Sequence, residues 1–546
     1  MRENQPFPLR GEGMPSSGSF DYVIVGAGSA GCVLAARLTE DPTARVLLLE
    51  AGTEDTDQNI KAPAALGLLF HSGVDWDYQT VEQEAAGRAF YWPRGKTLGG
   101  SSSTNVMLYA RGQRDDYDSW RDEYGATGWG FDDVQPYFVR AERNNRHGPP
   151  SHGAEGPLHV EDRPYTHELS RAWVDAALAW GLPPVEDIAG ASPQGAGLTQ
   201  VTCRDGRRWS TADAYLRPAL DRENLTVRTG ALATRVIMEG SKATGVAYLR
   251  DGTEHVARAD GEVVLSGGVV NSPQLLMLSG IGPSDVLREH GIDAAVVLPG
   301  VGRNLHDHVL APVVWETRDS SDIIVDLLTP ENRQQWAETG GGPFASNYAE
   351  AMAYLSVTPG VSRPDMQLTG GPTAFILSGQ EMPGRPVFTM NATQLRPRSR
   401  GHLTLASTDP RDHPLIDPRY FTDPEDEATL IRGVRAVIEI GDQEPLAAFL
   451  DRPYLPAGTD LRALDDATLS DHIRTWSGTA YHPVGTCAMG TGEAAVVDPE
   501  LRVHGTADLR VVDASVMPTV ASGNINAPTV MIAEKAADLI RGVPAA

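Results

Sequence analysis

The first regular pattern of hydrophobic positions begins at residue 21 and predicts a strand, a helix and a second strand in close succession. Asp21–Val25 (DYVIV) is short, β-branched and mostly apolar, as expected of a buried parallel strand. Cys32–Leu38 has the apolar character of a buried helix, and Arg45–Leu49 (RVLLL) is typical of a second buried strand. Between the first strand and the helix, Gly26–Gly31 (GAGSAG) matches G-x-G-x-x-G. This part of the chain therefore predicts a complete βαβ unit of the dinucleotide-binding type.

The glycines and one acidic residue of this unit have separate physical roles. Gly26 permits a tight turn, Gly28 lets the backbone approach a pyrophosphate, and Gly31 lets the helix pack closely on the strand. The helix N-terminus adds N–H donors and partial positive charge for the phosphates. Glu50 follows the last glycine by about 20 residues and can accept hydrogen bonds from ribose hydroxyls. Because its carboxylate would repel a 2′-phosphate, the ligand should be NAD or FAD rather than NADP; the alternative is a glycine-rich turn without a ligand.

Two later segments repeat the strand-to-helix pattern. Glu262–Leu265 is predicted to be a strand that leads into Gly267 and Gly268, and the next helix is predicted to begin at Ser272-Pro273. Near the C-terminus, Arg510–Asp513 is predicted to be a strand and Ala527–Arg541 a final helix. Both segments can belong to the same nucleotide-binding sheet as the first unit.

A different pattern fills the stretch from about 310 to 475. Segments such as Glu350–Val357 and His402–Leu405 alternate in polarity, which suits an antiparallel sheet on the substrate side. An insertion before it carries a predicted helix, Thr166–Trp180, whose tryptophans at 173 and 180 favour core packing. The predicted fold class is α/β, with a Rossmann-like nucleotide-binding domain and an α+β domain built on a mostly antiparallel sheet.

Charge and composition exclude several classes of protein. The chain has 546 residues, with 46 Lys and Arg against 72 Asp and Glu, for a net charge of −26. This surplus argues against binding to nucleic acid or to anionic membranes. No apolar run approaches the roughly 18 residues that a membrane span requires, so stable membrane insertion is not expected. Residues 1–18 are predicted to be a flexible leader, because they lack the apolar core of a secretory signal.

The cysteine and histidine content gives no sign of a metal site. Three scattered cysteines are too few for a disulfide framework or a zinc site, which fits a reducing compartment, and we expect a cytoplasmic protein. His306 and His308 lie close in sequence, but no set of carboxylates and histidines converges there. No metal ligand is therefore predicted, and the sequence does not indicate the oligomeric state.

Two further glycine-rich segments decide between FAD and NAD. Tyr91–Met107 (YWPRGKTLGGSSSTNVM) and Ser266–Pro283 (SGGVVNSPQLLMLSGIGP) resemble the two signature regions of the glucose–methanol–choline (GMC) family of FAD-dependent oxidoreductases. The resemblance extends from about residue 21 to about residue 540 and is strongest toward bacterial choline and alcohol dehydrogenases. It also covers Arg208–Pro218, Gly300–His308, Ser399–Asp417 and the C-terminal block from Tyr481.

The resemblance implies a discontinuous FAD-binding domain (19–158, 199–312 and 476–546) and a substrate-binding domain (159–198 and 313–475). It also implies a set of residues that contact FAD. These are Gly26, Gly28, Ser29, Ala30, Gly31, Glu50, Ala51, Arg94, Leu98, Gly99, Gly100, Ser103, Asn105, Val106, Val236, Gly267, Asp513, Ala514, Asn526, Pro528 and Thr529.

The C-terminal block carries the catalytic candidates that the resemblance implies. His482 occupies the position of the family's histidine at the flavin, where a near-neutral base can take the hydroxyl proton of an alcohol. The second catalytic position holds His or Asn in the family, and gapless counting places Asn524 there, with Asn526 as the alternative. Tyr481 is the candidate substrate contact. The final helix points its N-terminus at the flavin in this family, and its partial positive charge favours the reduced ring.

Two departures from the family pattern affect the cofactor linkage and the substrate. Some choline oxidases bind FAD covalently through a histidine at the position of Thr104, which offers no ring nitrogen, so noncovalent FAD is predicted. In choline oxidases an acid follows the Asp-His pair by two residues, whereas Asp307-His308 is followed by Val309 and Leu310. This leaves only Tyr481, and Glu316 nearby in sequence, to surround a cation. An uncharged primary alcohol is therefore predicted rather than choline.

The resulting hypothesis is the oxidation of an alcohol to an aldehyde by hydride transfer to FAD, followed by reoxidation by O₂ or by another acceptor. The alternatives are a lyase of the hydroxynitrile type, in which FAD is structural, a choline dehydrogenase or oxidase, and a non-catalytic FAD-binding protein. Each shares the fold, so the site must decide among them.

Overall fold

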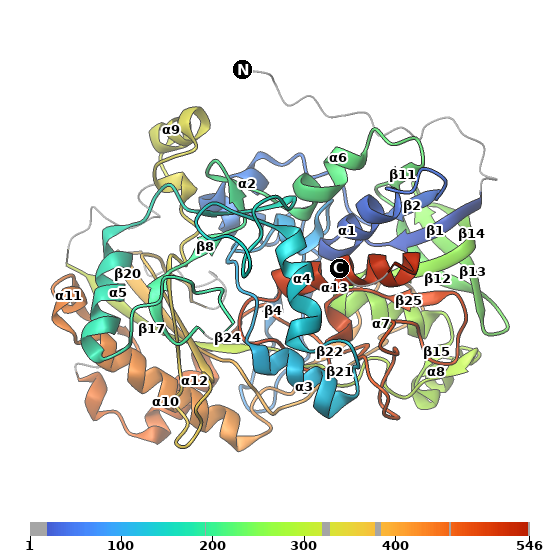
Figure 1. Cartoon of the computed structure of the whole chain (residues 1–546). Helices are drawn as coiled ribbons and strands as arrows, with labels where there is room; N and C mark the ends of the chain where they lie inside the picture. The colour runs from blue at the N-terminus through green and yellow to red at the C-terminus, as the bar shows by residue number, and fades with distance from the viewer. Residues whose placement is uncertain (1–18, 192, 319–327, 377–383, 458–459, 544–546) are drawn as a thin grey trace.

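Two seven-stranded sheets at opposite sides of the molecule organise the chain, and helix α13 (Asn526–Arg541) lies between them (Figure 1). The structure is a computed structural model, and it describes residues 19–191, 193–318, 328–376, 384–457 and 460–543. The predicted leader, 1–18, lies outside the described residues. The predicted combination of a Rossmann-like sheet with a mostly antiparallel sheet is confirmed.

The first sheet is the nucleotide-binding sheet. Its central strands β11, β2, β1, β14 and β25 are parallel, and β13 and β12 extend it in antiparallel fashion. All four residues of β2 are buried, as expected of a parallel strand covered on both faces. In sheet order the strands are β11 (Leu225–Arg228), β2 (Val46–Leu49), β1 (Ser19–Val25), β14 (Thr253–Leu265), β13 (Lys242–Arg250) and β12 (Leu232–Glu239), with β25 (Leu509–Val511) beside β14.

Helix α7 (Gly268–Leu278) begins earlier than the sequence predicts, and Pro273 lies inside it rather than at its start. A proline has no N–H to donate to the carbonyl four residues before it, which here is Val269. Thr486 Oγ1 donates to that carbonyl instead, at 2.7 Å. The helix therefore tolerates the proline because a residue distant in sequence replaces the missing hydrogen bond.

The second sheet is antiparallel throughout the pairs that form its main path. The strand predicted at Glu350–Val357 is its strand β18. The segment His402–Leu405 does form a strand, β21 (His402–Thr404), but it pairs only with β22 (Leu415–Asp417), outside this sheet. Alternating polarity predicts a strand without naming its partner, which explains the error. In sheet order the strands are β23 (Leu450–Leu455), β17 (Val309–Thr317), β20 (Val387–Gln394), β19 (Met366–Gly371), β18 (Ala351–Leu355) and β7 (Gly195–Leu198), with β24 (Gly478–Thr479) beside β17.

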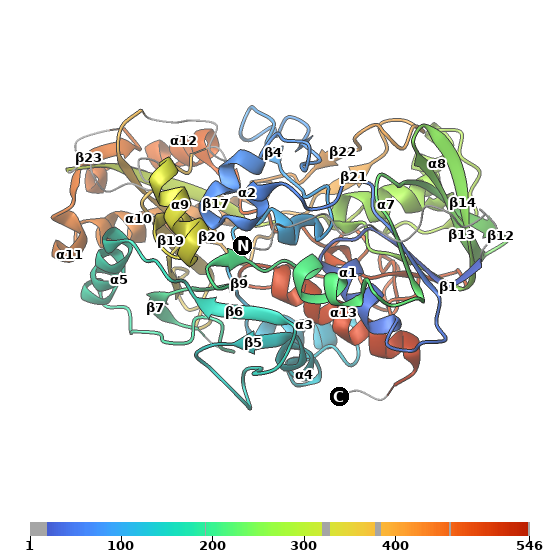
Figure 2. The same cartoon turned by 90° about the horizontal axis from the view of Figure 1, so that it is seen from above.

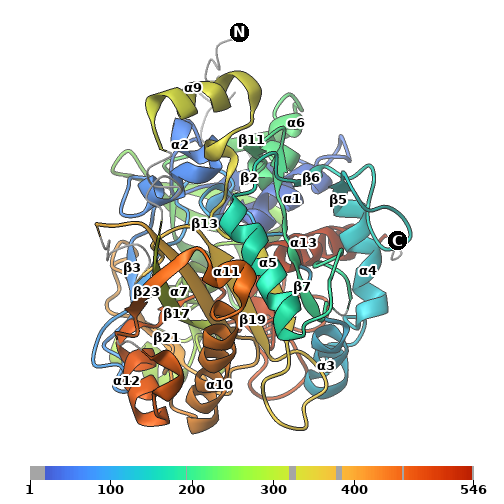
Figure 3. The same cartoon turned by 90° about the vertical axis from the view of Figure 1, so that its left-hand side faces the viewer.

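Helices α5 (Glu168–Trp180), α10 (Pro424–Gly441), α11 (Glu444–Ala447) and α12 (Asp466–Trp476) lie on the outer side of the second sheet (Figure 3). Trp173 of α5 is fully buried against Gly370, where a Cβ atom would lie 3.0 Å from the indole ring. The predicted core role of this tryptophan is confirmed. The outer face of the sheet is thus apolar and covered, which leaves its inner face toward α13 and the first sheet.

The remaining helices and short strands belong to neither of the two seven-stranded sheets (Figure 2). None of the helices in the described part of the chain combines the length and apolar character needed to cross a bilayer. These elements are α1 (Ser29–Leu38), α2 (Gln58–Lys61), α3 (Arg114–Tyr124), α4 (Phe131–Ala141), α6 (Arg217–Ala219), α8 (Ser284–Glu289), α9 (Pro330–Thr339), β3 (Tyr78–Gln79), β4 (Tyr91–Trp92), β5 (Glu142–Asn144), β6 (Leu158–Asp162), β8 (Gln200–Val201), β9 (Cys203–Arg204), β10 (Arg207–Arg208), β15 (Ile281–Gly282) and β16 (Val296–Val297).

The strands of each sheet come mainly from the segments assigned to its domain. Two elements cross the predicted boundaries: β24 lies in the segment assigned to the FAD-binding domain but pairs with β17, and β17 itself begins at Val309. The chain therefore passes between the two sheets next to residue 480, close to His482. The domain boundaries themselves stay a prediction.

Candidate active site

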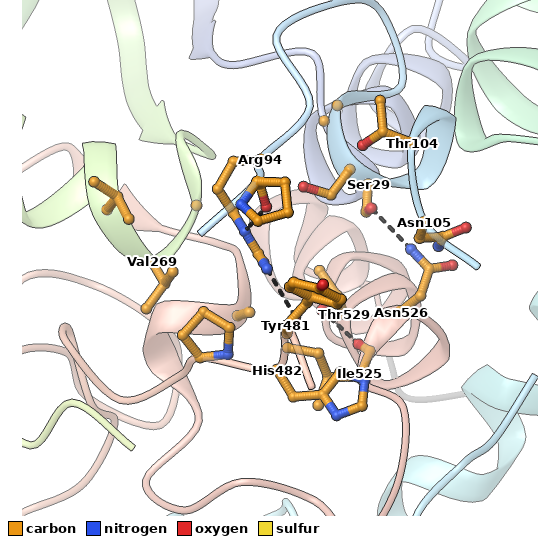
Figure 4. A pocket seen from close by; sticks show the side chains of 18 of the residues that line it. Ser29, Arg94, Thr104, Asn105, Val269, Tyr481, His482, Ile525, Asn526 and Thr529 are labelled. Atoms are coloured by element: carbon orange, nitrogen blue, oxygen red, sulfur yellow. Dashed lines mark hydrogen bonds between the residues drawn. The ribbon is translucent and has the colours of Figure 1, made fainter. Parts of the chain in front are cut away.

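A cavity of about 340 Å³ extends between the two sheets, and the N-termini of α1 and α13 meet at its wall. The side chains of Ser29 and Asn526 mark this junction: Asn526 Nδ2 donates to Ser29 Oγ at 2.9 Å (Figure 4). Two helix N-termini supply partial positive charge to the same space. This is the environment that the phosphates and the electron-rich reduced ring of FAD require.

Backbone segments from three glycine clusters touch one another beside the cavity: those at residues 26–31, 99–100 and 266–268. Gly26 has φ +99°, and a Cβ atom there would lie 2.5 Å from the carbonyl oxygen of Ser266. Gly100 has φ +51°, and its Cβ atom would lie 2.7 Å from Gly28 Cα. No side chain fits at either position. The wall is therefore bare backbone, as the close approach of a dinucleotide demands.

Glu50 lies at the end of β2 with its carboxylate held by backbone N–H groups. Its Oε2 accepts from the N–H of Ala27 and its Oε1 from the N–H of Gly52, each at 2.8 Å. Burial raises the pKa of Glu50 to about 7, although the two N–H donors act in the opposite direction. Each oxygen keeps a lone pair for a further donor, so the side chain can still accept from ribose hydroxyls. Glu50 and the bare backbone of the glycine clusters therefore fit the ribose and the phosphates of FAD.

The two catalytic candidates, His482 and Asn524, are in hydrogen-bond contact in the wall of the same cavity. Asn524 Nδ2 lies 3.0 Å from His482 Nε2, and behind His482 the ring of His308 lies with its Nδ1 3.0 Å from His482 Nδ1. The far nitrogen of His308, Nε2, lies 3.0 Å from the carbonyl oxygen of Leu395. Gln367 Nε2 reaches Asn524 Oδ1 at 3.5 Å. Five groups thus form one chain of hydrogen bonds through the catalytic pair.

The direction of this chain follows from its end, because a carbonyl oxygen can only accept. His308 must therefore donate from Nε2 to Leu395, and as a neutral ring it accepts at Nδ1. Burial lowers the pKa of His308 to about 4, which keeps the ring neutral. His482 consequently carries its proton on Nδ1, and the lone pair of its Nε2 accepts from Asn524 Nδ2 at the cavity wall. Burial, with His308 and Arg94 nearby, lowers the pKa of His482 well below its usual value, so the base is unprotonated at neutral pH.

The backbone on either side of His482 is held by buried polar groups. Asp307 Oδ1 accepts from the N–H of His482 at 2.9 Å, and its Oδ2 accepts from Thr479 Oγ1 at 2.6 Å. Tyr481 has φ +64°, an unusual conformation for a side chain of this size. Its N–H donates to Thr479 Oγ1 at 2.7 Å, and its carbonyl accepts from Arg94 Nη2 at 3.0 Å (Figure 4). This strained turn brings the tyrosine and the histidine to the same cavity.

Comparisons with known proteins agree with this geometry. The GMC oxidoreductase family model matches residues 20–310 and 397–533. The chain is 42% identical to the mitochondrial choline dehydrogenase of Mus musculus, over 100% of this chain and 93% of the relative. The chain belongs to the GMC oxidoreductase family. It is also 41% identical to alcohol dehydrogenase [acceptor] of Pseudomonas putida, over 95% of each chain. Pyridoxine 4-oxidase from Mesorbium loti has a similar structure, with a TM-score of 0.87, 35% identity and coverage of 95% and 98%.

Membership confirms the predicted cofactor and enzyme class. The protein is an FAD-dependent GMC oxidoreductase that acts on CH–OH donors. Most of the predicted FAD contacts line the cavity, as do both asparagine candidates, His482 and Tyr481. The predicted cofactor residues in its wall are Gly26, Gly28, Ser29, Ala30, Glu50, Ala51, Arg94, Gly100, Asn105, Val106, Gly267, Asp513, Ala514, Asn526 and Thr529.

Some predicted FAD contacts do not line the cavity. Gly31 packs α1 on the glycine turn, where its Cβ would lie 1.8 Å from the carbonyl oxygen of Gly26. Val236 donates its N–H to Ser279 Oγ, while the residues of this strand that reach the cavity are Leu232 and Ala233. Pro528 lies in the first turn of α13, next to the lining residue Thr529. Leu98, Gly99 and Ser103 shape the turn beneath Gly100 rather than the wall itself.

Sequence reasoning missed His308 as a partner of the base in this GMC oxidoreductase, because its spacing from His306 suggests only a metal ligand. It also missed the polar side chains that the second sheet turns toward the cavity, of which Asn391 and Thr393 of β20 are examples. A signal for them exists in Val387–Gln394 (VFTMNATQ), where polar residues alternate with apolar ones. Glu316, considered for a substrate cation, instead pairs with Arg385 and Arg452 outside the cavity.

Proposed function

We propose that this GMC oxidoreductase oxidises an uncharged primary alcohol to the aldehyde, with His482 as the base that accepts the hydroxyl proton. The observation that carries the proposal is the pair formed by His482 Nε2 and Asn524 Nδ2, 3.0 Å apart at the cavity wall. One atom can accept the proton and the other can donate to the alcohol oxygen. Asn526, the alternative candidate, is engaged with Ser29 and is assigned to the cofactor side.

Each side chain in and around the pair has a separate role in the reaction. When bound, FAD supplies the acceptor for the hydride that leaves the alcohol carbon. Asn524 holds the substrate oxygen while the hydroxyl proton moves to His482 Nε2. The new positive charge is then shared toward His308, whose Nδ1 lone pair accepts from His482 Nδ1–H. Asp307, fixed by Thr479, keeps the His482 backbone in place during this transfer.

The charges at the cavity wall favour an uncharged substrate over choline. Among the described residues, only Glu50 and Asp513 line the cavity as carboxylates, and both accept hydrogen bonds from backbone N–H groups that follow strands of the nucleotide-binding sheet. Arg94 places a positive charge beside Tyr481. Asp307 and Asp75, the carboxylates near Arg94, do not line the cavity, so a quaternary ammonium group would meet the Arg94 cation with no carboxylate in the cavity wall beside it.

An anaerobic panel of alcohols tests the proposal. Uncharged primary alcohols should bleach the flavin absorbance and yield one aldehyde per flavin reduced, whereas choline should do so more slowly. Turnover of a hydroxynitrile without bleaching would identify a lyase, and faster bleaching by choline would identify a choline dehydrogenase. Oxygen consumption under air then separates O₂ from another electron acceptor.

We predict that FAD is bound without a covalent bond. Thr104 lines the cavity at the position of the family's attachment histidine, and its hydroxyl cannot form the ring-nitrogen linkage. Denaturation with acid should release the yellow cofactor into the supernatant, where its absorbance is measured. Flavin that stays with the precipitated protein would contradict this prediction.

FAD affinity should fall as the pH drops below about 7. Above this pH, Glu50 of the FAD-free protein is ionised and ready to accept from ribose hydroxyls; below it, the carboxyl group is protonated and binding must release the proton. The Kd should rise by up to about tenfold per pH unit in this range, because one proton is linked to binding. Titration of the FAD-free protein, followed by flavin fluorescence, measures the effect. The variant Glu50→Gln should bind FAD more weakly and with no such slope.

We also propose a cytoplasmic location. Cys32, Cys203 and Cys487 are all buried and free, as is usual in a reducing compartment. Burial raises the pKa of Cys32 and of Cys203 to about 12, so both thiols are protonated and unreactive at neutral pH.

A further inference from the structure

Arg208 is an arginine that is buried behind the cavity wall without a carboxylate bonded to it. It belongs to β10 and is only 1% exposed. Within the described part of the chain, its hydrogen bonds go to three uncharged oxygen atoms, which belong to Ile60, Ser102 and Asn105. A buried charge costs free energy unless an opposite charge compensates it. The position of this guanidinium therefore calls for a physical reason.

The charged groups near Arg208 are already balanced among themselves. Asp213 is the carboxylate that acts on the guanidinium, and it pairs with Lys61 Nζ at 2.6 Å and with Arg217 Nε at 3.0 Å. Asp55 pairs with the same two cations. Two carboxylates and two cations cancel, so the positive charge of Arg208 is in excess. Burial lowers the pKa of Arg208 to about 10, which leaves the guanidinium charged at neutral pH.

The hydrogen bonds of Arg208 hold the turn Gly100–Ser103 from behind. Its Nη1 donates to the carbonyl of Ser102 at 3.2 Å, and its Nε donates to the carbonyl of Ile60 at 2.7 Å. Three residues later in the chain, the N–H of Thr211 donates to Ser102 Oγ at 3.0 Å. The front of this turn, at Gly100, lines the cavity. Arg208 therefore acts on a part of the wall that it does not itself reach.

The same guanidinium fixes the orientation of the Asn105 side chain. Asn105 Oδ1 accepts from Arg208 Nη1 at 2.8 Å and from the N–H of Met107 at 2.9 Å. Because both partners are donors, this atom must be the amide oxygen, and both of its lone pairs are used. Among the described residues, Asn105 Nδ2 has no hydrogen-bond partner, and it is accessible at the cavity wall rather than enclosed (Figure 4). Arg208 thus turns the donor end of the amide toward the cavity.

Asn105 lies between the two parts of the cavity that FAD joins. On one side, the backbone of Gly100 touches the phosphate-binding turn. On the other side, Val106 lines the cavity and packs against the apolar cluster that contains Leu395, whose carbonyl ends the hydrogen-bond chain of the catalytic histidines. The accessible N–H groups of Asn105 are therefore placed to donate to the cofactor.

We propose that Arg208 is a positioning residue for the flavin, which directs the N–H donors of Asn105 at FAD and supplies a buried positive charge that favours the reduced cofactor. Reduction makes the flavin electron-rich, so a donor and an uncompensated cation stabilise the reduced form more than the oxidised form. The inference goes beyond the proposed function, because it concerns the two redox states of FAD and holds for any substrate.

The reduction potential of the holoenzyme, measured by reductive titration against a reference dye, tests the proposal without any alcohol. Arg208→Met keeps a long unbranched side chain and removes both the charge and the donors. It should shift the equilibrium toward oxidised FAD by about tenfold or more, which for a two-electron couple lowers the potential by about 30 mV or more. A residue that only stabilised the fold would affect both redox states equally and leave the potential unchanged.

A second variant, Asn105→Asp, tests the same proposal with the buried arginine in place. The carboxylate keeps an oxygen for Met107 and for Arg208, so the hydrogen bonds that hold the turn remain. Its other oxygen takes the place of Nδ2 and cannot donate to FAD. The lost donor and the added negative charge act in the same direction, so the potential should again fall by about 30 mV or more. This result does not depend on whether the core tolerates Arg208→Met.

Arg207 is the matched control, because it precedes Arg208 in the same strand and its side chain points to the opposite face. Its Nη2 donates to the carbonyl of Ala337 at 2.8 Å, and its guanidinium lies 4.4 Å from the centre of the Trp336 ring. Arg207→Met should keep the wild-type potential. An unchanged potential in Asn105→Asp or in FAD-loaded Arg208→Met, or an equal fall in Arg207→Met, would overturn this inference. Failure of every alcohol to bleach the flavin would instead overturn the proposed function.

Discussion

Replacement of His482 by alanine should slow the reduction of FAD by substrate by about 10²–10⁴-fold, the range expected for loss of a general base. The reason is that Nε2 of this ring carries the lone pair that takes the hydroxyl proton, and Asn524 cannot replace it because an amide accepts no proton at neutral pH. The measurement is anaerobic stopped-flow bleaching of the flavin at saturating substrate.

The control for this experiment is a histidine on a strand that does not reach the cavity. His402 of β21 is such a residue, and His402→Ala should reduce flavin at the wild-type rate. FAD should remain bound to His482→Ala, because the glycine turn and Glu50 lie on the other side of the cavity. Rapid reduction of the His482 variant by substrate would refute the assignment of this residue as the base.

The hydrogen-bond chain behind the base determines which ring nitrogen of His482 carries the proton. His308 donates to the carbonyl of Leu395, which fixes the proton of His482 on Nδ1. This tautomer is a property of three residues from separate parts of the chain. The carbonyl oxygen of Leu395 can only accept a hydrogen bond. The donor–acceptor direction from His482 through His308 to Leu395 is therefore not reversed by the titration of a side chain at neutral pH.

The parts of the site that the sequence predicts correctly depend on local geometry. The first βαβ unit follows from a short apolar strand, a glycine turn and a helix, all within about 30 residues. Gly26 takes its place because the turn requires a positive φ there and leaves no room for a Cβ atom. The same holds for Glu50, which stands at the end of a strand whose register with its neighbours is set by burial.

The parts that escape prediction depend on partners far away in the chain. The start of α7 is mispredicted because Thr486 supplies the hydrogen bond that Pro273 cannot. The role of His308 depends on the carbonyl of Leu395, and the place of Asn391 in the cavity wall depends on the pairing of β19 with β20. Such contacts are set by tertiary packing, and no local pattern of residues encodes them.

Substitution of Gly100 by alanine should weaken FAD binding by about 10–100-fold. A Cβ atom at this position would lie 2.7 Å from Gly28 Cα, so the phosphate-binding turn must move away from the cavity to accept it. Overpacking of this kind costs about 1–3 kcal/mol, and each 1.4 kcal/mol lost from binding raises the Kd about tenfold. Titration of the FAD-free variant with FAD, followed by fluorescence quenching, gives the Kd.

Gly87 provides the matched control, because it separates backbone strain from the clash. It also has a left-handed backbone, with φ +64°, but no atom lies within 4 Å of the position that a Cβ atom would take there, and it does not line the cavity. Gly87→Ala should therefore bear the conformational cost, about 1 kcal/mol, as a lower Tm with unchanged FAD affinity. If Gly100→Ala also kept the wild-type Kd, the contact between the two glycine clusters would have no part in holding the dinucleotide. The expected contrast arises because the Gly100 backbone touches the turn that must carry the phosphates, whereas the Gly87 backbone touches nothing that FAD needs.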